Sequence, residues 1–153
     1  MRTADGLLTG VEALLRWTHP TRGPVPPLQV VQIAERSGLI IDIGSWVLER
    51  ACRDRGRWLT QHPTAPLDLA VNISTRQLVH PDFAATVAAA LTDSGMDCDS
   101  LILEMTENIF IEESERATSA LAELREVGAR LALDDLGTGF PRSATCAASR
   151  CTS

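Results

Sequence analysis

The sequence predicts an α/β fold in which a parallel sheet is covered by helices. Short apolar runs of strand length alternate along the chain with stretches of helical periodicity. The helical stretches end at glycines, as at Gly38, Gly95 and Gly128, where left-handed backbone closes a helix. The strand-like runs close on acidic or amide residues. This repeated strand–helix order is typical of a parallel sheet with helices packed outside it.

The first half of the chain is expected to hold a strand and two helices. Alternating polar and apolar residues predict a strand over residues 11–17. A proline-rich loop follows, and Pro26 and Pro27 suit the start of a short helix over residues 28–37. An apolar stripe at a period of 3.6 residues predicts a second helix over about residues 42–61.

The second half is expected to continue with three strands and two helices. The strands are predicted over residues 67–73, 101–106 and 129–134, which are apolar and of strand length. Apolar residues at helical spacing mark one helix that ends at Gly95 and another that ends at Gly128. About four parallel strands with outer helices therefore follow from the pattern.

Composition restricts the function classes. The chain has 153 residues with 44% hydrophobic content, enough for one globular domain. The 14 basic and 20 acidic residues give a net charge of -6, which argues against a DNA- or RNA-binding surface. No apolar run approaches the roughly 18 residues of a membrane span, and no signal-peptide pattern opens the chain, so a cytoplasmic protein is expected. The scattered cysteines are expected to be free thiols.

Polar residues lie near the ends of all four predicted strands. Glu12, Asn72, Glu104 and Asp134 would project from neighbouring carboxyl ends into one small volume. Three carboxylates this close repel one another unless a divalent cation lies among them, and an all-oxygen set suits Mg²⁺ or Mn²⁺ better than zinc. Asp135 would then face a second ion or the attacking water of an in-line displacement at phosphorus.

Several motifs occur in an order that resembles the EAL domain, a family of cyclic-di-GMP phosphodiesterases that hydrolyse this dinucleotide to linear pGpG. The resemblance covers about residues 7–139. The matching segments include Glu12-Ala13-Leu14-Leu15-Arg16-Trp17, Val71-Asn72-Ile73-Ser74, Glu104-Met105-Thr106-Glu107 and Asp134-Asp135-Leu136-Gly137-Thr138-Gly139.

The resemblance implies a fold and a role for each site residue. The family fold is a TIM-like barrel, of which this chain would supply about four of the eight strands. In the family the residues that match Glu12, Asn72, Glu104 and Asp134 ligate metal, and the residue that matches Asp135 contributes to the second metal. By the same resemblance Arg16 contacts substrate phosphate and Glu107 orders the loop after the aspartate pair.

The sequence departs from the family pattern at both ends. The opening strand of the family, with its Gln-Pro, has no counterpart here, and neither do the lysine and the late glutamate that hold and activate the attacking water. We expect residues 140–153 to be unrelated to the family. If residues 145–150 are encoded by GC-rich codons, a shifted reading frame translates them into a segment that resembles the family sequence. We therefore interpret residues 1–139 as a truncated EAL domain and residues 140–153 as a frameshifted tail.

Three functions compete on this basis. The leading interpretation is a fragment of a cyclic-di-GMP phosphodiesterase that is inactive as this chain. The alternatives are a non-catalytic degenerate EAL module that binds cyclic-di-GMP or a protein partner, and a remnant without function. An incomplete barrel also exposes strand edges, which predicts self-association through those edges.

Aromatic and histidine side chains are assigned structural places. Trp17, Trp46 and Trp58 fit packing faces and are expected in the core. His19, His62 and His80 lie in loops beside proline without metal-ligand spacing, so surface positions are expected for them.

Overall fold

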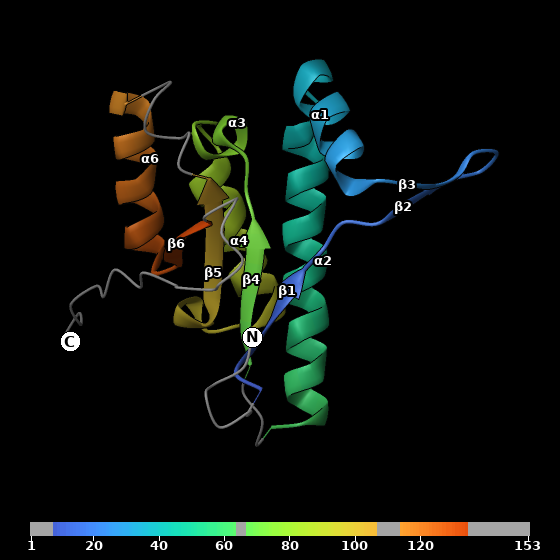
Figure 1. Cartoon of the computed structure of the whole chain (residues 1–153). Coiled ribbons are helices and arrows are strands. Elements are labelled where there is room, and N and C mark those ends of the chain that lie inside the picture. The colour runs from blue at the N-terminus through green and yellow to red at the C-terminus, as the bar shows by residue number, and fades with distance from the viewer. Residues whose placement is uncertain (1–7, 64–66, 107–113, 135–153) are drawn as a thin grey trace, which may run out of the picture.

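The computed structural model describes residues 8–63, 67–106 and 114–134, with Ser114 and Asp134 described by their backbones (Figure 1). The elements in chain order are β1 (Gly10–Ala13), β2 (Trp17–His19), β3 (Gly23–Val25), α1 (Pro27–Ser37), α2 (Ile40–Gln61), β4 (Asp68–Asn72), α3 (Thr75–Leu78), α4 (Phe83–Ser94), the 3₁₀ turn η1 (Cys98–Ser100), β5 (Leu101–Thr106), α6 (Ser114–Val127) and β6 (Arg130–Asp134).

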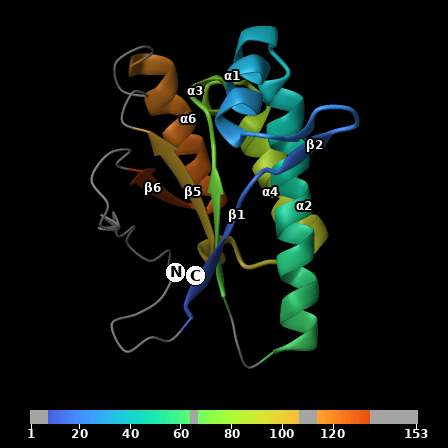
Figure 2. The same ribbon diagram turned by 45° about the vertical axis from the view of Figure 1, so that its right-hand side comes forward.

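Four of the strands form one parallel sheet in the order β1-β4-β5-β6. Each consecutive pair is joined through helices, and α2, α4 and α6 lie on the same face of the sheet (Figures 1 and 2). The predicted α/β class with four parallel strands is therefore confirmed. Within the described residues, β1 and β6 are the two edge strands of this sheet.

The main core lies between the sheet and these three helices. Successive strand residues point to opposite faces, so every second side chain of β4 and β5 enters this layer. The buried members from the strands are Leu69, Val71, Leu101, Leu103 and Met105, and those from the helices include Leu48, Cys52, Val87, Leu91, Ala117 and Leu124.

The helix boundaries follow the local signals in the sequence. Pro27 occupies the first turn of α1, and Gly38 ends it in the left-handed region with φ of 81°. Gly95 ends α4 in the same way with φ of 62°. The second predicted helix begins two residues earlier than expected, at Ile40, and ends at Gln61 as expected. No helix among the described residues is long and apolar enough to cross a membrane.

The single strand expected over residues 11–17 is wrong. Strand β1 ends at Ala13, which pairs with Val71. Only one residue of β4 follows Val71, so β4 offers almost no further partners to an extension of β1. The chain then forms an antiparallel ribbon in which Trp17 pairs with Val25. The ring Nδ1 of His19 accepts hydrogen bonds from the backbone N–H groups of Thr21 and Arg22, at 3.2 and 3.3 Å, which fixes the turn between β2 and β3.

The core assignment of the tryptophans is also wrong. Trp17, Trp46 and Trp58 are 46%, 57% and 46% exposed. In α2, Leu48 and Cys52 face the buried layer, whereas Trp46 and Trp58 lie outside that contact and line a groove beside β1. Periodicity shows which side of a helix is apolar, but it does not show whether a neighbour covers all of that side.

Candidate functional site

Three of the predicted site residues occupy equivalent faces of neighbouring strands. Asn72 on β4 is the direct register partner of Glu104 on β5. Glu12 on β1 pairs with Ala70, which lies two residues before Asn72 and hence on the same face. This face is opposite the one that carries Val71 and Leu103 into the core. Glu12, Asn72 and Glu104 therefore share the side of the sheet that the helices do not cover.

The first contact in this group joins β1 to β4. Asn72 donates a hydrogen bond from Nδ2 to Oε1 of Glu12 at 2.7 Å, although 60 residues separate them in sequence. Both residues are exposed, whereas Glu104 is partly buried. A neutral amide thus lies on the strand between the two that carry carboxylates, β1 and β5, where it reduces the repulsion that two adjacent acids would feel.

A tight turn after Asn72 holds the end of β4. The backbone N–H of Ile73 donates to the carbonyl oxygen of Glu104 at 2.8 Å, which ties β4 to β5 beside the site. Ser74 then begins α3 with a capping box, in which its hydroxyl accepts from the backbone N–H of Gln77 while the Gln77 side chain accepts from the backbone N–H of Ser74. Gln77 is buried against the backbone of α2 at Gly44.

The aspartate pair falls at the border of the described residues. Asp134 is the last residue of β6, and its backbone pairs with Thr106, two residues past Glu104. It therefore occupies the strand-end register position that the sequence predicts. Asp135 and Glu107 lie outside the described residues, so their roles stay predictions.

Arg16 lies in the segment between β1 and β2. Its guanidinium Nη1 donates to the carbonyl oxygen of Leu15 at 2.8 Å, and its side chain is exposed. Together with Glu12 it lines a groove between β1 and α2. Its predicted contact with substrate phosphate stays a prediction.

The donor set suits a hard divalent cation. Glu12 and Glu104 supply carboxylate oxygens, and turning the Asn72 amide about its last torsion would present its oxygen in place of its nitrogen. Among the side chains that the structure describes, no three His, Cys, Asp or Glu residues come close enough to form a metal site by themselves. The described part therefore offers two acids and one amide as candidate ligands, and the contribution of the aspartate pair stays a prediction.

Two features of this region were not predicted from the sequence. Helix α3 was missed, although the spacing of Ser74 and Gln77 is a capping-box signature that could have revealed it. The groove beside β1 was missed because it depends on how α2 is placed against the sheet. The sequence pattern alone carries no signal for this groove.

Comparison with known proteins places these residues in a family context. The EAL domain model matches residues 1–151. An uncharacterized signaling protein of Caulobacter vibrioides is 44% identical over 144 residues, which is 94% of this chain and 17% of that protein. The bifunctional diguanylate cyclase/cyclic di-GMP phosphodiesterase MucR of Pseudomonas aeruginosa is 39% identical over 136 residues, 89% of this chain and 20% of that protein.

Solved structures give the same result. The PaMucR phosphodiesterase in complex with c-di-GMP superposes with a TM-score of 0.79 at 39% identity, covering 90% of this chain and 55% of that one. The EAL enzyme Bd1971, bound to cAMP and cyclic-di-GMP, superposes with a TM-score of 0.78 at 32% identity, covering 90% of this chain and 38% of that one. These neighbours are TIM-like barrels, so the four-stranded sheet corresponds to part of such a barrel. The chain spans about half of the PaMucR structure and about a fifth of the curated MucR protein.

Proposed function

The chain belongs to the EAL domain family, and we propose that it carries the metal-ligand portion of an active site for hydrolysis of cyclic-di-GMP. The observation that carries the proposal is the placement of Glu12, Asn72 and Glu104 on one face of three adjacent parallel strands, opposite the helices, with Asn72 in contact with Glu12. Parallel α/β proteins use this end of their strands for chemistry.

Each predicted residue has a role in the proposal. Glu12, Asn72, Glu104 and Asp134 would hold a Mg²⁺ or Mn²⁺ ion, and Asp135 would contribute to a second ion. When bound, such ions lower the pKa of water and neutralise charge that develops on a phosphodiester. Arg16 would orient the substrate by pairing its guanidinium with a phosphate oxygen. Glu107 would order the loop that carries Asp135.

We further propose that this chain alone does not turn over cyclic-di-GMP. The resemblance assigns the holding and activation of the attacking water to a lysine and a late glutamate, and neither has a counterpart in this sequence. The retained oxygen ligands and Arg16 favour a second candidate, a module that binds the metal–dinucleotide complex without cleaving it. Both candidates bind metal without turnover, and an active phosphodiesterase would differ from both in turnover.

Metal binding tests the shared part of the proposal. Titration of the chain with Mn²⁺, followed by electron paramagnetic resonance of the free ion, should show saturable binding. Glu12→Gln keeps the size of the side chain and removes its charge, and it should weaken binding at least tenfold. Glu49→Gln makes the same change at an exposed position of α2 and should leave binding unaltered. Equal binding by all three proteins would refute the assignment of Glu12.

Turnover separates enzyme from binding module. Cyclic-di-GMP incubated with the chain and Mg²⁺ or Mn²⁺, and analysed by chromatography, should give no pGpG above background. The PaMucR phosphodiesterase serves as the positive control. Metal-dependent pGpG formation that disappears in Glu12→Ala would overturn the proposal of inactivity and establish the chain as an enzyme.

A further inference from the structure

The turn that follows Asn72 is held by hydrogen bonds between Ser74 and Gln77. Ser74 Oγ accepts a hydrogen bond from the backbone N–H of Gln77 at 3.3 Å. Gln77 Oε1 accepts from the backbone N–H and from the hydroxyl of Ser74, each at 3.2 Å. Gln77 is 5% exposed, so water competes little for these bonds, and hydrogen bonds are stronger in such a low-dielectric setting than at the surface. Ser74 and Gln77 therefore fix the path of the chain just after the end of β4.

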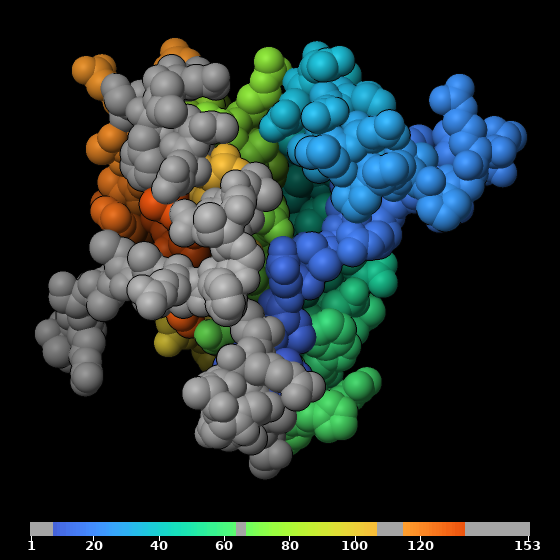
Figure 3. All heavy atoms as spheres, viewed as in Figure 1, coloured from blue at the N-terminus to red at the C-terminus, as the bar shows by residue number. Residues whose placement is uncertain are grey.

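Gln77 also fastens this turn to helix α2. The amide of Gln77 lies against the backbone of α2 at Gly44, where any Cβ atom would overlap it. The next residue, Leu78, is 1% exposed and belongs to the main core. Figure 3 shows α3, in green, between α6, in orange, and α1, in blue. Helix α3 spans four residues, and its contacts with α2 and α6 hold it in place.

The anchored turn begins one residue after Asn72 and is bonded to the backbone of Glu104. Ile73 lies between Asn72 and the cap, and its backbone N–H donates to the carbonyl oxygen of Glu104 at 2.8 Å. Asn72 is the last residue of β4 and is exposed, so the direction of its side chain depends on the backbone that carries it. The β4 ladder holds this backbone before Asn72, and the cap holds it afterwards. The contact of 2.7 Å from Asn72 Nδ2 to Glu12 Oε1 is made from this position.

We propose that Gln77 is a positioning residue for Asn72 and, through it, for the candidate metal site. The Gln77 side chain fixes Ser74, Ser74 fixes the end of β4, and the end of β4 sets where the Asn72 amide meets Glu12. The inference deepens the proposed function and rests on it as far as Asn72 is a metal ligand. The position of the Asn72 amide can be measured without metal, so the two claims fail separately. Residues that orient metal ligands from behind typically contribute about 10–100-fold to metal affinity.

The side-chain amide of Asn72 gives a direct readout of its position by nuclear magnetic resonance. The sequence contains two asparagines, Asn72 and Asn108, so the full chain labelled with ¹⁵N at asparagine side-chain amides gives two pairs of signals. Asn108→Ser removes one pair and assigns the other to Asn72. The hydrogen bond to Glu12 should move one Asn72 proton downfield, and Glu12→Ala defines the signal of an amide without this acceptor. All spectra are recorded without metal.

Removing the acceptor oxygen of Gln77 should release the Asn72 amide. Gln77→Met keeps the length of the side chain but has no oxygen to accept from Ser74, so the Asn72 signal should move toward its position in Glu12→Ala. Binding of Mn²⁺, followed by electron paramagnetic resonance, should weaken about tenfold. Gln77→Glu keeps an acceptor oxygen, as in a capping box with glutamate, so it should keep the Asn72 signal and bind Mn²⁺ at least as tightly as the wild type. Gln32→Met makes the same change at an exposed position of α1 and should alter neither readout.

A second variant disturbs Gln77 without replacing it. Gly44→Ala pushes against the Gln77 amide from α2 and should move the Asn72 signal in the same direction. Gly56→Ala is its matched control, because a Cβ atom at Gly56 would lie 2.6 Å from the carbonyl oxygen of Ser94 in α4. This change also overpacks α2, but away from α3, so it should lower stability and leave the Asn72 signal in place.

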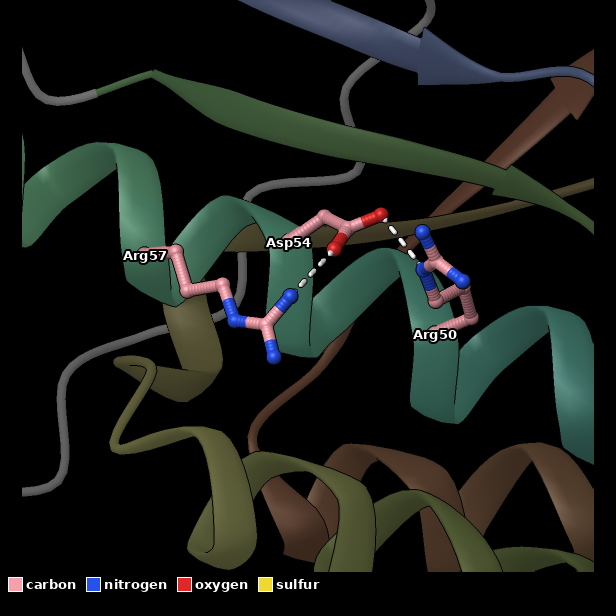
Figure 4. A network of polar contacts seen from close by, with 3 residues as sticks. All are labelled: Arg50, Asp54 and Arg57. Atoms are coloured by element: carbon pink, nitrogen blue, oxygen red, sulfur yellow. Dashed lines mark hydrogen bonds and ion pairs between the residues drawn. The ribbon is translucent and has the colours of Figure 1, made fainter.

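Polar contacts along α2 provide another control. Arg50 Nε lies 2.7 Å from Asp54 Oδ2, and Arg57 Nη1 lies 3.5 Å from Asp54 Oδ1 (Figure 4). Asp54→Asn removes the negative charge that both ion pairs share, and it should leave the Asn72 signal unaltered. A shift in this variant would contradict the proposal, because the spectrum would then report the general state of α2 rather than the contact with Gln77.

The position of the Asn72 signal decides the outcome. A signal that is unchanged in Gln77→Met and Gly44→Ala, in chains that circular dichroism shows to be folded, overturns the positioning role. A signal that moves as far in Gly56→Ala as in Gly44→Ala also overturns it, because Gln77 is then one structural contact among others. A signal that moves in Gln77→Met while the wild type binds no Mn²⁺ supports the positioning role and refutes the proposed metal site.

Discussion

Replacing Gly44 by alanine tests how α3 is held in place after β4. Gly44 lies in the second turn of α2, and a Cβ atom built there overlaps the amide group of Gln77. Gln77 is buried and its Oε1 accepts from the backbone N–H and the hydroxyl of Ser74. The added methyl group must therefore displace the side chain that closes the capping box directly after Asn72.

The expected magnitude combines a gain and two losses. Alanine is favoured over glycine inside a helix by about 1 kcal/mol. Overpacking at a buried contact costs about 1–3 kcal/mol, and loss of the cap costs about 1 kcal/mol. The losses exceed the gain, so Gly44→Ala should lower the free energy of unfolding by about 1–3 kcal/mol.

A double-mutant cycle isolates the contact. Gln77→Ala removes both the obstructing amide and the cap, so Gly44→Ala in that background should be stabilising by about 1 kcal/mol. The coupling between the two positions is then about 2–4 kcal/mol. Urea denaturation followed by circular dichroism at 222 nm measures all four proteins. The same effect of Gly44→Ala in both backgrounds would refute the packing of Gln77 against α2.

Three further predictions concern the buried Cys52 and the ion pair at the starts of β4 and β6. Burial raises the pKa of the Cys52 thiol from 9.0 to about 11, and the charge of Arg55 lowers this pKa by a smaller amount. Buried Cys52 should therefore react with iodoacetamide at pH 8 far more slowly than exposed Cys98, which peptide mass mapping would measure. Because the folded state favours the protonated thiol, Cys52 should stabilise the fold fully below pH 9.0, and this contribution should be lost as the pH rises toward 11. Urea midpoints that do not fall over this interval would contradict the prediction. Arg130 Nη1 lies 2.7 Å from Asp68 Oδ2, and both side chains are partly exposed. Arg130→Ala should therefore lower the free energy of unfolding by under about 1 kcal/mol, and by less in 1 M NaCl. A larger loss in urea denaturation that does not depend on salt would contradict a screened surface pair.

Local signals predicted much of the fold, and tertiary contacts decided the rest. Gly38 and Gly95 ended their helices because the left-handed backbone they adopt is a property of the residue itself. Strand β1 was predicted too long because its end depends on where β4 stops offering partners, which the sequence of residues 11–17 does not contain. The exposure of Trp46 likewise depends on whether a neighbour covers α2, and no periodicity within the helix carries that information.

The candidate site was predictable to the level of strands and faces, because alternation fixes which side of a strand each residue occupies. Glu12, Asn72 and Glu104 lie on one face near the carboxyl ends of adjacent parallel strands, as alternation predicts. The hydrogen bond between Asn72 and Glu12 was not foreseen, since the shift of two residues between their strands is set by packing. The role of Asp135 stays a prediction from the motif.

On the sheet face opposite the helices, the residues that stabilise the fold precede the candidate ligands along β4 and β5. Ala70 and Ile102, which lie two residues before Asn72 and Glu104, are buried and apolar, whereas Asn72 at the end of β4 is exposed. Burial of apolar surface is the main stabilising term in a fold, so packing on this face depends on the earlier residues and the polar residues at the ends contribute little to it. Substitutions at Glu12 or Asn72 should therefore change metal affinity without unfolding the chain. Loss of Mn²⁺ binding in Glu12→Gln with an unchanged urea midpoint would thus report on the site itself.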